Sequence, residues 1–88
     1  MKVEFKKSLV KDLERVRDKS LKERVRQTIE RVEEAQTLQE IGNVKRLRGG
    51  ERYYRIRVGD YRLGLMLEGD TVIFVRFLHR KDVYRYFP

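Results

Sequence analysis

Three closely spaced arginines have the clearest potential for chemistry in this sequence. Arg55, Arg57 and Arg62 flank Gly59-Asp60, a dipeptide that is typical of a two-residue β-hairpin turn. Because successive side chains of a strand point to opposite faces, a turn at this dipeptide puts all three arginines on one face. Like charges that lie opposite each other destabilise a sheet. We therefore expect this arginine face to bind an anion, and guanidinium geometry matches that of phosphate.

The same turn predicts how the hairpin strands pair. A two-residue loop sets four opposing pairs, which are Val58 with Tyr61, Arg57 with Arg62, Ile56 with Leu63, and Arg55 with Gly64. Because Gly64 has no side chain, this pairing predicts a cationic floor with room above it for a phosphate. The other face of the hairpin is apolar and is expected to pack against the rest of the protein.

Proton transfer requires other side chains, because the pKa of arginine exceeds about 12 and its guanidinium stays protonated. His79 and Tyr84 lie in the C-terminal segment, with the basic residues Arg80 and Lys81 between them. Histidine titrates near neutral pH, and a tyrosine hydroxyl can also exchange a proton. We expect His79 and Tyr84 to share the roles of general acid and general base, with either assignment open. A purely structural role at the strand end is the alternative for His79.

The N-terminal half of the chain is expected to begin with a short strand and then to be helical. Alternating apolar residues predict the strand over residues 1–5, and apolar residues at helical spacing predict helices over about 7–17 and about 20–36. Ser20 and Glu23 have the S-x-x-E spacing of a capping box at the start of the second helix. Two amphipathic helices joined by a tight turn form an antiparallel helical hairpin.

The second half of the chain is expected to be a sheet. The arginine-bearing hairpin is followed by a turn at residues 68–70, a strand-forming run over 71–78, and a last segment, 79–88, that is either a short helix or an extended tail. Helices grouped first and antiparallel strands grouped later indicate an α+β fold. We predict a single domain, residues 1–88, in which the N-terminal strand and the helical hairpin pack on one face of a small, mostly antiparallel sheet. The arginine face is then expected to be open.

The register of the last strand depends on its turn. A two-residue loop at Gly69-Asp70 puts Phe77 and His79 on the arginine face, whereas a three-residue loop reverses the parity and puts Arg76 and Arg80 there. Both alternatives are open from the sequence. Arg76 is also expected to pair with an acidic residue of a helix, so we leave it out of the candidate site.

The charge is concentrated in the second half of the chain. The net charge is +8, and residues 41–88 carry 11 Lys and Arg against 5 Asp and Glu, whereas residues 1–40 carry 11 against 9. Arginines interleaved with aromatic residues indicate binding to nucleic acid or another polyanion. With no Cys and one His, we expect no disulfide and no metal site. No apolar run approaches the ~18 residues of a membrane span and no signal peptide opens the chain, so a cytoplasmic protein is expected.

Two segments together resemble the RelE/ParE superfamily of toxins from type II toxin–antitoxin systems. They are the run from Arg46-Leu47 to the hairpin, with its Tyr54–Leu63 string, and the run His79-Arg80-Lys81-Asp82-Val83-Tyr84. The order of elements matches across nearly the whole chain, so the resemblance implies a RelE-like fold. RelE-like members cleave messenger RNA, typically in the ribosomal A site, whereas ParE-like members poison DNA gyrase and are not nucleases. Both are neutralised by an antitoxin that wraps an extended segment around the toxin.

The resemblance also implies a set of site residues. The expected catalytic residues are Arg55, Arg57, Arg62, His79, Arg80 and Tyr84. Basic and aromatic residues around them are expected to bind RNA, and these are Lys45, Arg46, Arg48, Arg52, Tyr53 and Lys81. This sequence departs from the best-studied RelE pattern at two places: Arg55 and Arg57 replace lysines on the first hairpin strand, and a histidine, His79, stands at the end of the last strand.

We expect a metal-independent endoribonuclease that cleaves mRNA by 2′-hydroxyl attack on phosphate and requires no cofactor. Its expected partners are a cognate antitoxin in a hetero-oligomer, mRNA and the ribosome, with no membrane. The first alternative is a ParE-like inhibitor of DNA gyrase without nuclease activity, and the second is a non-catalytic RNA-binding module.

Overall fold

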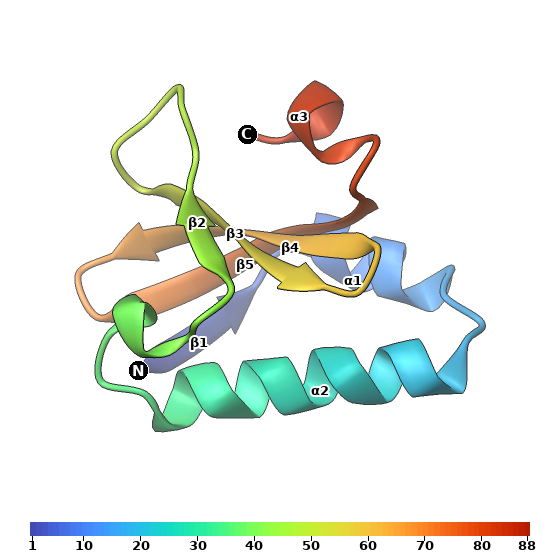
Figure 1. The fold of residues 1–88 in the computed structure, drawn as a ribbon, viewed down its shortest axis with the longest axis horizontal. Helices are drawn as coiled ribbons and strands as arrows, with labels where there is room; N and C mark the ends of the chain where they lie inside the picture. Colours follow the sequence, from blue (N-terminus) through green and yellow to red (C-terminus); the bar gives the residue numbers. More distant parts are fainter.

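One five-stranded sheet organises the computed structural model, which describes residues 1–88 (Figure 1). The strand order is β1-β5-β4-β3-β2, and only the pairing of β1 with β5 is parallel. The bounds of the strands are β1 (Lys2–Phe5), β2 (Val44–Arg46), β3 (Tyr53–Val58), β4 (Tyr61–Glu68) and β5 (Thr71–His79). The predicted α+β fold with a mostly antiparallel sheet is confirmed. The strand β2 lies in a stretch whose sequence pattern is too irregular to predict it.

The helices are α1 (Lys7–Glu14), α2 (Lys19–Glu34), a 3₁₀ turn η1 (Leu38–Glu40) and α3 (Val83–Tyr86). The predicted capping box is wrong, because Ser20 lies inside α2. Asp18 caps this helix instead, with its carboxylate accepting a hydrogen bond from the amide of Leu21 at 3.1 Å. None of these helices combines the length and the apolar character that crossing a membrane requires.

The main core lies between α1, α2 and one face of the sheet, which we call the helix face. It joins 13 buried residues, including Leu9 and Val32 from the helices and Leu63, Leu65 and Phe74 from the sheet. In Figure 1, α2 lies on one side of the sheet and α3 on the other. The apolar face of the predicted hairpin therefore meets the helices, as its alternation indicates.

The predicted register of the β3–β4 hairpin is confirmed in all four pairs. Val58 lies opposite Tyr61 and Arg57 opposite Arg62, and the pairing continues through Gly64 opposite Arg55. The turn requires a residue with positive φ, and Gly59 supplies it with a φ of 59°. The arginine face is therefore a real structural feature, set by a two-residue loop.

The strand β5 follows one predicted register at its start and the other at its end. Its turn is the two-residue Gly69-Asp70 loop, but an irregularity at Gly64/Leu65 leaves Val75 as an extra residue in β5. Beyond this bulge the parity is reversed, so Phe77 and His79 point to the helix face. The expectation that a two-residue loop would put these two side chains on the arginine face is therefore wrong.

The edge of β5 beyond the bulge is covered by α1. Parallel pairing with β1 ends at Phe74, and Asp12 of α1 then accepts a hydrogen bond from the amide of Phe77 at 2.9 Å. The same carboxylate pairs with Arg76, with Nε–Oδ2 at 2.7 Å. The prediction that Arg76 pairs with an acidic residue of a helix is confirmed. The bond from Asp12 also raises the pKa of Arg76.

The C-terminal segment covers part of the arginine face, which was predicted to be open. Phe87 is 3% exposed and forms a second, smaller core with Leu47 and Val83. A Cβ on Gly64 would lie 2.8 Å from the Phe87 ring, so the ring fills the space that the sequence left for a phosphate. That expectation is wrong, because Gly64 makes room for an aromatic anchor instead.

Candidate functional site

Five of the six predicted catalytic residues lie close together on the arginine face. Arg57 and Arg62 face each other across β3 and β4, and Arg55 lies opposite Gly64. Partial burial lowers the pKa of Arg62, and the positive charges of Arg55, Arg57 and Arg80 lower it further. The nearby Tyr84 acts in the opposite direction and raises it. These effects show that the four arginines and Tyr84 are close enough to form one electrostatic cluster.

The arginines of this cluster have no acidic partner. The four ion pairs of the protein involve other basic residues, so Arg55, Arg57, Arg62 and Arg80 keep their charges uncompensated. Arg62 instead donates from Nη1 to the carbonyls of Gly59 at 3.0 Å and Tyr61 at 2.9 Å. These two hydrogen bonds orient its guanidinium against the hairpin turn. A cluster of oriented, unpaired guanidinium groups is a strong binding site for phosphate.

Tyr84 is bound directly to this cluster. Nε of Arg55 donates to the Tyr84 hydroxyl at 3.0 Å, and the Tyr84 residue is 65% exposed. The helix α3 carries Tyr84, and Val83 and Phe87 anchor that helix on the sheet. The sequence analysis missed Phe87 as a residue that positions the site. The combination of a small residue, Gly64, in a strand with an aromatic residue near the chain end is the signal that could have found it.

A basic groove adjoins Tyr84. Its volume is about 400 Å³, and it is lined by Lys45, Arg46, Leu47, Arg48, Tyr84, Phe87 and Pro88. Lys45 lies opposite Arg55 in the sheet, so it extends the arginine face towards β2. Three of the predicted RNA-binding residues are therefore positioned beside the catalytic candidates.

The other predicted RNA-binding residues have different surroundings. Arg52 is paired with Glu68, with Nη1–Oε1 at 3.1 Å. The ring of Tyr53 packs edge-on against Phe87 with centroids 5.7 Å apart, so it is part of the second core. Lys81 is exposed in the turn after β5, where its backbone amide donates to Nδ1 of His79 at 3.2 Å.

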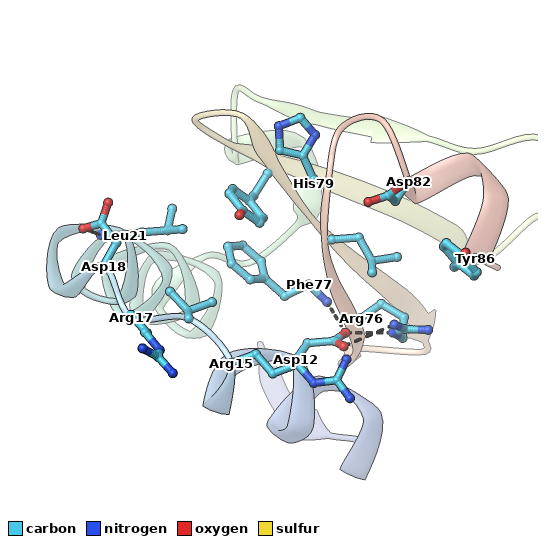
Figure 2. Close-up of a pocket in the computed structure, with 13 residues that line it drawn as sticks. Asp12, Arg15, Arg17, Asp18, Leu21, Arg76, Phe77, His79, Asp82 and Tyr86 are labelled. Atoms are coloured by element: carbon cyan, nitrogen blue, oxygen red, sulfur yellow. Dashed lines mark hydrogen bonds and ion pairs between the residues drawn. The ribbon is translucent and has the colours of Figure 1, made fainter.

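His79 is separated from the arginine cluster. Its ring packs edge-on against Tyr61, with centroids 5.3 Å apart, and Tyr61 stacks on Phe77. His79, Phe77, Asp12 and Arg76 line a cavity of about 810 Å³, and Figure 2 shows these side chains and the Asp12–Arg76 pair. The bulge in β5 turns the His79 side chain to the helix face, so the structure does not bring His79 and Tyr84 together. The largest cavity of the protein is therefore not the arginine site.

Comparison with known proteins identifies the class to which this fold and site belong. A crystal structure of a RelB–RelE antitoxin–toxin complex from Methanococcus jannaschii has a TM-score of 0.81 to this chain at 42% identity, covering 97% of this chain and 99% of that one. The YoeB dimer of Staphylococcus aureus shares the fold with a TM-score of 0.73 at 16% identity, covering 90% and 95% of the two chains. The fold is thus that of small toxins of the RelE and YoeB type.

The sequence comparisons agree with the fold. Residues 3–84 match the family described as the ParE toxin of type II toxin–antitoxin system, parDE. Toxin RelE3 of Methanocaldococcus jannaschii is 45% identical over 89 residues, which cover the whole of both chains. The chain therefore belongs to the ParE toxin family of type II toxin–antitoxin systems, and its relatives place it in the RelE-like branch of the RelE/ParE superfamily.

Proposed function

We propose that this toxin is an endoribonuclease that cleaves mRNA in the ribosomal A site and thereby inhibits translation. The observation that carries the proposal is the cluster of unpaired arginines with the Tyr84 hydroxyl bound to Arg55 at 3.0 Å. Membership of the RelE-like branch supports the same activity. A protein that only binds a partner has no need for a tyrosine hydroxyl held against several uncompensated guanidinium groups.

The proposed reaction uses the substrate's own nucleophile. The ribose 2′-hydroxyl loses its proton and attacks the adjacent phosphorus, while the bond from phosphorus to the 5′-oxygen breaks and that oxygen gains a proton. Negative charge builds on the phosphate oxygens, where Arg55, Arg57 and Arg62 stabilise it. One well-placed donor of this kind contributes about 3–4 kcal/mol to the transition state. No step in this scheme requires a metal ion.

Tyr84 is the residue that we assign to proton transfer. Its exposed hydroxyl is accessible to a bound RNA strand, and the hydrogen bond from Arg55 fixes its position. His79 points to the helix face, so we do not include it in the chemistry at the phosphate. Arg80, which follows β5, adds positive charge beside Arg62. Lys45, Arg46 and Arg48 bind the RNA strand along the groove next to Tyr84.

We further propose that a cognate antitoxin binds this chain in a hetero-oligomer and holds it inactive. The support is that a similar toxin, 42% identical, was crystallised in a complex with RelB antitoxin. The proposed substrate and ribosome place the activity in the cytoplasm.

Mapping new mRNA ends after brief expression of the toxin tests the activity. We expect cuts within translated regions that follow the codon phase. The family description also names ParE, and gyrase inhibition is the alternative activity that the sequence resemblance implies. Intact mRNA together with gyrase-linked DNA breaks would therefore refute the nuclease and establish the alternative of a gyrase inhibitor.

A further inference from the structure

A second basic pocket lies on the far side of Arg57, between α2 and the end of β3. Its volume is about 260 Å³, and it is lined by Arg24, Gln27, Thr28, Arg31, Asn43, Arg57 and Val58. Six of these seven residues are polar and none is acidic. The pocket therefore offers hydrogen-bond donors and positive charge without an internal counter-charge.

The three arginines of this pocket are unpaired although acidic residues are close in sequence. Arg24, Arg31 and Arg57 take part in none of the ion pairs of the protein. On α2, the carboxylates of Glu23 and Glu30 both bind Arg26, which lies outside the pocket. The acidic residues are thus turned away from Arg24 and Arg31. The guanidinium groups of Arg24 and Arg31 lie along one side of this pocket and repel each other unless an anion lies between them.

The walls of the pocket are held in place by the fold. Arg24 reaches over the β3–β4 turn, where a Cβ on Gly59 would lie 2.8 Å from its Nη1. Arg24, Thr28 and Arg31 follow one another along the same face of α2. Asn43 is bound to Arg57 in both directions, because its side-chain amide donates to the Arg57 carbonyl and its own carbonyl accepts from the Arg57 amide at 3.1 Å. Arg24 is therefore packed against the turn, and Asn43 fixes the end of β3 beside it.

Arg57 connects this pocket to the arginine cluster. It lines the pocket and it also lies opposite Arg62 in the sheet. We propose that the pocket is a second phosphate subsite, in which Arg24 and Arg31 bind the phosphodiester backbone of RNA next to the phosphate held by the arginine cluster. This inference rests on the proposed function, and it adds residues of α2 to an RNA site otherwise built from the sheet and the C-terminal segment. The backbone belongs either to the mRNA substrate or to ribosomal RNA.

Binding of RNA that cannot be cut tests this subsite. The probe is a short single-stranded RNA with 2′-O-methyl riboses, which lack the attacking hydroxyl, and affinity is measured as a function of salt concentration. Each phosphate contact to a single strand contributes about 0.7 to the slope of log K against log salt. We expect the Arg24→Gln/Arg31→Gln variant to bind more weakly, with a slope lower by about 1.4. The Lys19→Gln/Lys22→Gln variant removes the same charge from the same helix outside the pocket and should keep the slope.

Four further measurements distinguish the possible outcomes. The Arg24→Lys/Arg31→Lys variant should recover most of the slope, and thermal unfolding should show that all variants are folded. Binding to ribosomes without mRNA separates the two sources of backbone, because a loss confined to ribosomes assigns the pocket to ribosomal RNA. Unchanged binding to both probes, or a loss seen only with the antitoxin, overturns the proposal. Cleavage of mRNA by the wild-type protein is measured separately, so a failure of the proposed function is distinguishable.

Discussion

The two faces of the sheet differ in composition: the helix face is an apolar core, and the arginine face carries unpaired positive charge. The helix face buries 13 residues in a continuous apolar core, including Phe74, which is fully buried. The core on the arginine face joins only three buried residues, Leu47, Val83 and Phe87, and Arg55, Arg57, Arg62 and Arg80 have no carboxylate partners. Apolar burial is the main source of folding stability, so stability comes mostly from the helix face. The arginine face keeps charge repulsion that only a bound anion relieves.

The comparison also shows why the small core on the arginine face exists. Its residues contribute little area, but they fix α3 above the sheet and so hold Tyr84 against Arg55. The position of the Tyr84 hydroxyl thus depends on an aromatic anchor, Phe87, that packs over Gly64. Substitutions on the helix face should change stability, whereas substitutions on the arginine face should change activity. A substitution of Phe87 should change both.

The largest effect is expected from Phe74→Ala on the helix face. Removing a fully buried aromatic ring, which also stacks on Phe5 with centroids 5.7 Å apart, should lower the free energy of unfolding by about 3–5 kcal/mol. Urea unfolding measures this loss. Val10→Ala is the matched control, because Val10 is 48% exposed and should change stability by less than about 0.5 kcal/mol. If the Phe74→Ala variant were as stable as the wild type, the conclusion that stability comes mostly from the helix face would be wrong.

Arg62→Ala, on the arginine face, should lower activity without lowering stability. We expect cleavage to fall about 10²–10³-fold, because a charge-stabilising donor is lost, and growth arrest to be relieved. The folded protein lowers the pKa of Arg62, so folding disfavours its charged form at every pH at which the guanidinium is protonated. Stability at neutral pH should therefore be equal or higher, and antitoxin binding should be largely intact. Arg17→Ala, an exposed arginine outside the cluster, serves as the control, and equal toxicity of both variants would contradict the site.

Tyr84→Phe tests the hydroxyl alone. Cleavage should fall about 10²-fold if this group transfers a proton, while stability and antitoxin binding stay unchanged because the Tyr84 residue is exposed. Tyr86→Phe is a close control, since Tyr86 is an exposed tyrosine of the same helix. Single-turnover cleavage of RNA on ribosomes is the measurement. If neither Arg62→Ala nor Tyr84→Phe changes toxicity, the assignment of the site is wrong.

Phe87→Ala should lower stability less than Phe74→Ala does, because Phe87 belongs to the smaller core. We expect a decrease of about 1.5–3 kcal/mol in the free energy of unfolding, together with reduced cleavage as Tyr84 loses its position. The decrease in cleavage should appear in kcat more than in KM. Phe87→Leu fills part of the same space and should restore most of both. Full activity of Phe87→Ala would show that the anchor does not position Tyr84.

Local pattern predicted the parts of this protein that depend on neighbouring residues. The hairpin register, the two helices and the α+β class all follow from alternation, helical spacing and one turn dipeptide. The cap of α2 was assigned to the wrong residue, because Asp18 and Ser20 are both good capping types and the sequence does not rank them. The strand β2 was missed because three residues at a sheet edge carry too short a pattern.

The residue types of the candidate site could be predicted from the sequence, but their complete arrangement in space could not. The sequence by itself determined the arginine face, because side-chain alternation and a two-residue turn place Arg55, Arg57 and Arg62 together whatever packs around them. Only the tertiary structure decided that His79 leaves this face and that Tyr84 joins it. The bulge at Val75 and the packing of Phe87 over Gly64 each result from contacts between distant segments, which no local pattern encodes.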